Sequence, residues 1–163
     1  LFNAMSPLTA RAPGLVGAAL TDPRPWCGLI VDGRHVDPLT LRIALACRPK
    51  DRFLLVTDAM PCVGSSSNHF LLDGRTIHVR DGACEDEHGT LAGSAIDLLT
   101  AVRNAVRWLQ LDLSTAAAMA STYPAQFLGL STERGLLMPG YRADFLLLDN
   151  EGPAEVYVGG EQV

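Results

Sequence analysis

Residues 27–57 read CGLIVDGRHVDPLTLRIALACRPKDRFLLVT, and this stretch decides the fold that the sequence predicts. Its ends, Cys27–Asp32 and Phe53–Thr57, are short apolar runs, which are typical of strands buried on both faces of a parallel sheet. Asp37 before a proline is an N-cap signal, so a helix is predicted over Pro38–Cys47, and its buried face would carry Leu41, Ala44 and Leu45. The order strand, helix, strand predicts two parallel strands and an α/β fold.

The remainder of the chain alternates between β and α patterns. Phe70–Leu72 and Thr76–Val79 are expected to form a hairpin. A helix is expected after the Ser94-x-x-Asp97 signature, with Leu99, Val102, Val106 and Leu109 in one stripe. The later elements are expected to be a helix from about Ser114, a helical turn at Pro124–Leu128, and strands at Ala143–Leu148 and Glu155–Val158. The composition changes near Gly135. We therefore expect an α/β domain over residues 1–134 and a small β element over residues 135–163.

Composition narrows the classes of function. The 163 residues carry a net charge of −5, and 48% are apolar, so the chain can bury a core and is not disordered. The acidic balance argues against nucleic acid as a partner, and no apolar run is long enough for a membrane span. The four cysteines, which are Cys27, Cys47, Cys62 and Cys84, form no CxxC pair, so we expect reduced thiols in a cytoplasmic protein.

Two polar side chains follow the two predicted strands. His35 lies just after the first strand and Asp58 just after the second. Because the carboxyl ends of neighbouring parallel strands meet at one edge of a sheet, both residues are expected to face one cleft. Asp58 could be a general base or a metal ligand there, or only a helix N-cap. His35 could equally be a loop histidine that hydrogen-bonds to backbone.

Other candidates have weaker local signals. Arg11 is a lone arginine, a residue type that suits a phosphate but is usually solvated. Residues 91–94 (LAGS) precede a predicted helix, so their N–H groups could bind an oxygen-rich ligand or serve only as a cap. His69, His78 and His88 lack the i, i+4 spacing of a zinc site and are expected to be strand or surface residues.

These features occur together in an order that resembles a known family. The motifs are LFNAM, Arg11-x-Pro13-Gly14, CGLIVDGRHV, LVTDAM, EHGTLAGSA, AVRNAV, MASTYPAQFLGL and GLLMPGYRADFLLLD. Their succession is similar to the N-acetylglucosamine-6-phosphate deacetylases of the amidohydrolase superfamily. The resemblance implies the C-terminal part of a metal-dependent (β/α)8 TIM barrel over residues 1–134. It also implies that residues 135–163 are the returning strands of a small β-sandwich domain.

The resemblance also implies roles for individual residues. Asp58 in LVTDAM matches the catalytic aspartate at the end of the last barrel strand, which acts as general base and then as general acid. Arg11 and His35 match positions that hold the sugar phosphate. The substrate-binding positions as a set are Asn3, Ala4, Arg11, Asp32, Gly33, Arg34, His35, Leu91, Ala92 and Gly93. Ala92 departs mildly from the family, which often has serine there.

The implied activity is hydrolysis of the acetamide of N-acetyl-D-glucosamine 6-phosphate, by a homodimer that uses a divalent metal, with zinc the expected ion. The family has a metal-binding histidine directly before the motif that here starts at Leu1. We therefore expect the metal ligands upstream, none within this chain, and no activity from the chain alone. The alternatives are another metal-dependent amidohydrolase acting on an N-acyl or cyclic amide, and a non-catalytic piece that binds a sugar phosphate.

Overall fold

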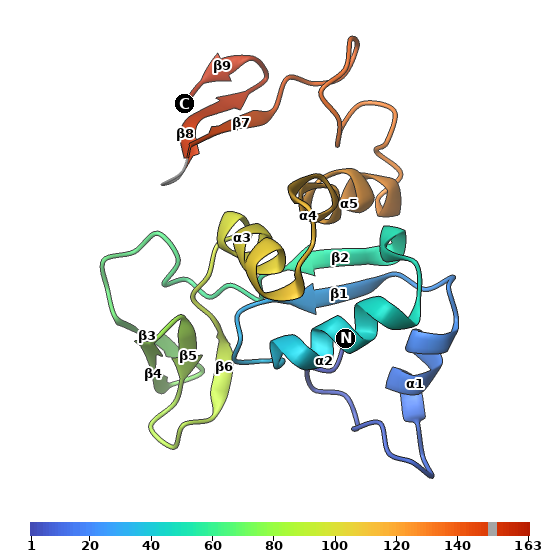
Figure 1. Cartoon of the computed structure of the whole chain (residues 1–163). Coiled ribbons are helices and arrows are strands. Elements are labelled where there is room, and N and C mark those ends of the chain that lie inside the picture. Colours follow the sequence, from blue (N-terminus) through green and yellow to red (C-terminus); the bar gives the residue numbers. More distant parts are fainter. Residues whose placement is uncertain (150–152) are drawn as a thin grey trace. The chain divides into compact units, whose positions relative to one another are not determined.

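The computed structural model describes residues 1–149 and 153–163, which form two compact units, Leu1–Ala120 and Ser121–Val163 (Figure 1). The boundary between the units precedes the composition change at Gly135, because the segment around Gly135 packs on the helix after Ser121. The Thr122 hydroxyl donates a hydrogen bond of 2.7 Å to the Gly135 carbonyl. The assignment of residues 1–134 and 135–163 to a barrel and a sandwich stays a prediction.

The first unit is built on the predicted strand–helix–strand segment. Strands β1 (Cys27–Ile30) and β2 (Phe53–Val56) pair in parallel, and α2 (Pro38–Cys47) connects them with the short 3-10 helix Lys50–Arg52. The Asp37 side chain accepts a hydrogen bond of 2.7 Å from the Leu39 N–H, which confirms the predicted N-cap. The predicted buried face of α2 is also confirmed. The α/β fold class therefore follows directly from this stretch.

Helix α1 (Gly14–Thr21) was not predicted, because the residue at its N-cap position, Pro13, makes no side-chain hydrogen bond to the helix. The loop between α1 and β1 is held by the buried guanidinium of Arg48. Its two terminal nitrogens donate to three backbone carbonyls at 2.6–2.8 Å, those of Ala19, Pro23 and Pro25. Arg48 therefore fixes the approach of the chain to β1 by satisfying carbonyls that would otherwise be unpaired.

An antiparallel sheet follows β2, in the order β3 (His69–Leu72), β4 (Arg75–Arg80), β5 (Ala83–Glu85) and β6 (Leu91–Ser94). The predicted hairpin between β3 and β4 is confirmed, and its turn residues Asp73 and Gly74 both have positive φ, as a type I′ turn requires. The strands β5 and β6 were not predicted, since they are short and lack alternating apolar residues. Cys62, Ile77 and Cys84 form the buried core beneath this sheet.

Helix α3 (Leu98–Leu109) begins later than the Ser94 signature predicts. Asp97 itself is the N-cap, and its carboxylate accepts a hydrogen bond of 2.7 Å from the Thr100 N–H. The capping role predicted for Ser94 is therefore wrong, because Ser94 ends strand β6. Helix α4 (Leu113–Ala120) starts within a residue of its predicted position, and Figure 1 shows α3 and α4 beside β2.

The second unit contains α5 (Thr122–Phe127) and the antiparallel strands β7 (Phe145–Leu148), β8 (Pro153–Val158) and β9 (Glu161–Gln162). Gly159 and Gly160 form the turn that joins β8 to β9. The rings of Phe145 and Tyr157 stack across β7 and β8 with centroids 4.5 Å apart. Within the part of the chain that the structure describes, no helix has the length and hydropathy needed to cross a membrane.

Candidate active site

The ends of β1 and β2 bring the predicted histidine and aspartate together. The Nε2 atom of His35 lies 3.3 Å from Oδ2 of Asp58. This contact confirms the predicted adjacency, which follows from the parallel pairing of the two strands. Asp58 caps no helix, and the His35 ring contacts carboxylates rather than backbone. The two structural alternatives considered for these residues are therefore wrong.

Asp32 anchors the histidine from the other side. Its carboxylate accepts hydrogen bonds from the backbone N–H groups of Arg34 and His35, each at 2.9 Å, and contacts Nδ1 of His35 at 2.6 Å. Burial of the carboxyl would raise its pKa, but these hydrogen bonds favour the anion and lower the pKa of Asp32 below its usual value. Asp32 is therefore a carboxylate that accepts a hydrogen bond from the Nδ1–H of His35.

The backbone of Asp58 is held by strand β6. Asp58 has a φ of 54°, a left-handed conformation that non-glycine residues rarely adopt. Its carbonyl accepts a hydrogen bond of 2.8 Å from the Ser94 N–H, while the Ser94 hydroxyl donates to the Thr57 carbonyl. The LAGS stretch is thus not the lead-in to a helix that the sequence predicts. It is a strand that supports the turn carrying Asp58.

The other predicted substrate-binding residues lie in three places. Leu91, Ala92 and Gly93 belong to β6, and Gly33 and Arg34 lie in the turn that also carries Asp32. Arg34 forms an exposed ion pair of 3.4 Å with Asp81. Asn3, Ala4 and Arg11 are exposed in the segment before α1. Among the described residues, no hydrogen bond or ion pair joins Arg11 to His35 or Asp58.

Several residues that shape this site carry no functional signal in the sequence. The Asn104 side chain, on α3, donates a hydrogen bond of 2.7 Å to the Val31 carbonyl at the end of β1. Trp108 on the same helix lies against Gly33, where an added Cβ would come within 3.4 Å of its ring. Asn104 lies outside the apolar stripe that the sequence predicts for this helix, which is formed by Leu99, Val102, Val106 and Leu109. Nothing in the sequence therefore indicated that the Asn104 side chain reaches the end of β1.

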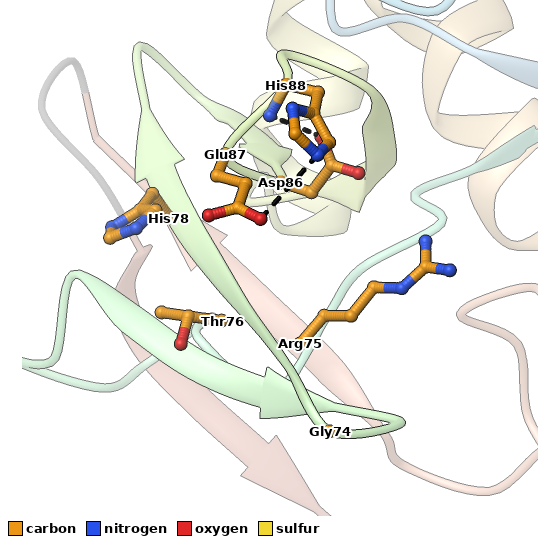
Figure 2. Close-up of a pocket in the computed structure, with 7 residues that line it drawn as sticks. All are labelled: Gly74, Arg75, Thr76, His78, Asp86, Glu87 and His88. Atoms are coloured by element: carbon orange, nitrogen blue, oxygen red, sulfur yellow. Dashed lines mark hydrogen bonds and ion pairs between the residues drawn. The ribbon is translucent and has the colours of Figure 1, made fainter.

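A hollow of about 710 Å³ lies elsewhere, on the sheet β3–β6, and Figure 2 shows the side chains around it. Glu87 and His88 face each other at 3.5 Å, and both are largely exposed. The Asp86 carboxylate accepts hydrogen bonds from the N–H groups of His88 and Thr90, each at 2.9 Å. These contacts organise a loop and leave no buried polar atom directed at a ligand, so we do not assign a site there.

Amidohydrolases generally depend on a metal, but the residues present do not make a metal site. Across residues 1–149 and 153–163, no group of three or more His, Cys, Asp or Glu side chains could hold a metal ion. A metal needs about three protein ligands. Asp32, His35 and Asp58 are joined in a chain of contacts, and the Asp32 carboxylate already accepts three hydrogen bonds.

Comparisons with known proteins identify the family of this chain. Residues 37–163 match the model of the family described as "Amidohydrolase family", so the chain belongs to the amidohydrolase family. It is 41% identical to an N-acetylgalactosamine-6-phosphate deacetylase of Shewanella sp. (strain ANA-3), covering 99% of this chain and 41% of that protein.

Solved structures give the same result. An N-acetylglucosamine-6-phosphate deacetylase from Pasteurella multocida matches with a TM-score of 0.93 and 36% identity, over 100% of this chain and 43% of that one. A variant of the Mycobacterium smegmatis enzyme in complex with N-acetyl-D-glucosamine-6-phosphate matches with a TM-score of 0.90 and 35% identity, over 99% and 44%. The resemblance noted in the sequence is thereby confirmed. The chain spans about two fifths of the length of these relatives.

Proposed function

We propose that this chain is the C-terminal part of an N-acetylglucosamine-6-phosphate deacetylase, which hydrolyses the acetamide of N-acetyl-D-glucosamine 6-phosphate to glucosamine 6-phosphate and acetate. The observation that carries the proposal is Asp58, a half-exposed carboxylate at the end of β2. Its backbone is fixed by Ser94 and its side chain faces a buried histidine. A related structure of 35% identity that holds N-acetyl-D-glucosamine-6-phosphate supports the choice of substrate.

The proposed role of Asp58 is proton transfer. Amide hydrolysis adds water to the carbonyl carbon and breaks the C–N bond, so one proton must leave the water and one must reach the departing nitrogen. A carboxylate can accept the first proton and donate it to the amine, which keeps the proton count balanced. The side chain of Asp58 is 47% exposed, so it is open to a ligand.

The remaining residues would hold the substrate. Arg11 offers a guanidinium that suits the 6-phosphate, and the family motifs assign the phosphate to His35 as well. The other proposed substrate-binding residues are Asn3, Ala4, Asp32, Gly33, Arg34, Leu91, Ala92 and Gly93. Contacts to the distant phosphate would orient the acetamide for reaction.

The architecture proposed for the whole enzyme follows the family. Residues 1–134 would complete a (β/α)8 barrel and residues 135–163 a β-sandwich domain, in a homodimer with zinc bound by residues outside this chain. A reducing cytoplasmic setting is supported by the free thiols of all four cysteines.

A second substrate is favoured by a specific observation. The Shewanella relative, at 41% identity, bears the name N-acetylgalactosamine-6-phosphate deacetylase. That sugar differs from N-acetylglucosamine only in the configuration of one hydroxyl, so the same carboxylate and phosphate contacts would serve both.

Acetate release tests the proposal. The full-length protein that carries this chain is assayed with the 6-phosphates of N-acetylglucosamine and N-acetylgalactosamine, and with unphosphorylated N-acetylglucosamine. The highest kcat/KM is expected for N-acetylglucosamine 6-phosphate. A preference for the galactosamine compound would select the second substrate, and no acetate from either phosphate would refute the proposed activity.

A further inference from the structure

We propose that His35 is a positioning residue for Asp58, so that the Asp32–His35 pair orients the carboxylate that transfers the proton. The proposal rests on the proposed function. It gives the His35 ring a different partner from the sugar phosphate that the family motifs assign to it.

The first argument is the occupancy of the two ring nitrogens. Asp32 is a buried carboxylate and can only accept hydrogen bonds, so the Nδ1 atom of His35 must donate to it at 2.6 Å. That contact fixes both the protonated nitrogen and the plane of the ring. The remaining nitrogen, Nε2, faces Oδ2 of Asp58 at 3.3 Å.

The second argument is exposure. The His35 side chain is 3% exposed, whereas that of Asp58 is 47% exposed. A ligand can therefore reach Asp58 directly, whereas the His35 ring is covered and its Nε2 faces the Asp58 carboxylate. His35 is placed to act on a ligand through Asp58.

The third argument is that the contact suits both protonation states of the aspartate. The contact uses one oxygen of Asp58, Oδ2, and a proton on Nε2 can donate to it. The proton that leaves water can bind the other oxygen, Oδ1, before it passes to the amine, so the contact with His35 can persist while Asp58 gains and loses its own proton. The backbone of Asp58 is held separately by Ser94, so loss of the ring releases only the Asp58 side chain.

The kinetic test replaces His35 in the full-length enzyme by two residues with amide side chains, each of which imitates one nitrogen of the ring. His35→Asn keeps a donor for Asp32 and removes the contact with Asp58, so kcat should fall on the order of 10²-fold with little change in KM. His35→Gln places an amide nitrogen near the position of Nε2 and should recover a large part of that loss. His88→Asn, at an exposed histidine, serves as the matched control and should leave kcat unchanged.

Two kinetic results would overturn the proposal. One is a wild-type kcat for His35→Asn. The other is a large rise in KM for the phosphorylated sugar alone, with kcat unchanged, which would assign His35 to the phosphate.

A spectroscopic test does not depend on turnover. In ¹⁵N spectra of histidine-labelled enzyme, His35 should show a protonated Nδ1, and Asp58→Asn should shift the Nε2 resonance. Asp81→Asn, which alters only the exposed ion pair with Arg34, should not shift it. An Nε2 resonance unmoved by Asp58→Asn would overturn the proposal. A shifted resonance in a protein that deacetylates no sugar would instead refute the proposed function alone.

Discussion

Replacing Gly93 by alanine should test how β6 supports the aspartate. Gly93 has a φ of 126°, which L side chains rarely adopt. An added Cβ would lie 2.5 Å from Cγ and 2.8 Å from Sδ of Met60, and 3.0 Å from the carbonyl oxygen of Asp58. The Met60 side chain can move, but the Asp58 carbonyl is hydrogen-bonded to Ser94 and cannot move without displacing the turn that carries Asp58.

The expected cost of Gly93→Ala has two parts. The backbone strain costs about 1–3 kcal/mol and the overpacking about 1–3 kcal/mol, or about 2–6 kcal/mol together. For a chain of this size that lowers Tm by at least about 4 °C. Gly74→Ala is the matched control, because Gly74 also has a positive φ but has no atom within 4 Å of an added Cβ. It should cost only about 1–2 kcal/mol.

Thermal or urea denaturation of the purified variants measures both costs. Met60→Ala in the Gly93→Ala background should recover part of the loss, so a double-mutant cycle should give a coupling energy of about 0.5–3 kcal/mol. Equal losses for Gly93→Ala and Gly74→Ala, with no coupling to Met60, would refute the close approach of β6 to the Asp58 turn.

Three further outcomes are expected. Arg48→Met should cost about 3 kcal/mol or more, because it removes the donors to three carbonyls; a loss in the urea midpoint no larger than for Arg107→Met, at an exposed arginine, would contradict this. Burial, reinforced by the Cys62 thiol, raises the pKa of Cys84 from 9.0 to about 12, so the folded protein favours the protonated thiol. The contribution of this thiol to the free energy of unfolding is therefore complete below pH 9 and is lost as pH rises toward about 12. Denaturation over that range should show the fall, and Cys84→Val should reduce it; a pH dependence that this substitution leaves unaltered would be evidence against the buried thiol. Arg11→Ala in the full-length enzyme should raise KM at least about tenfold for the phosphorylated sugar but not for its unphosphorylated analogue, as loss of a charge-assisted contact predicts; equal effects on both would argue against phosphate binding.

The local fold was predictable where strong signals agree. Asp37-Pro38 defined the first residue of helix α2, and two apolar runs defined the parallel pair β1–β2. Strand β6 was not predictable, because Leu91–Ser94 contains three small residues and no alternation of apolar and polar side chains, and its conformation depends on pairing with β5 and Ala59. For the same reason Ser94 resembled a helix cap, although its hydroxyl bonds to Thr57.

The candidate site was predictable as a place but not as a set of contacts. Parallel strands put His35 and Asp58 at one sheet edge, and this adjacency needs only the order of the elements. The partner of each nitrogen of the His35 ring depends on the tight turn at Asp32, where the Asp32 carboxylate accepts three hydrogen bonds. Likewise the contact of Cys62 with Cys84, at 3.4 Å between the sulfur atoms, depends on the packing of β5 against the loop after β2. The spacing of these residues along the chain predicts neither contact.

The central claim is that Asp58 transfers the proton in amide hydrolysis, and the most direct test is kcat for Asp58→Asn in the full-length enzyme. The asparagine amide keeps the size of the carboxylate but cannot accept the proton. We expect kcat for acetate release from N-acetylglucosamine 6-phosphate to fall by about 10²-fold or more, while calorimetry shows an unchanged Kd for the substrate. A kcat close to that of the wild type would contradict the account and remove Asp58 from the reaction.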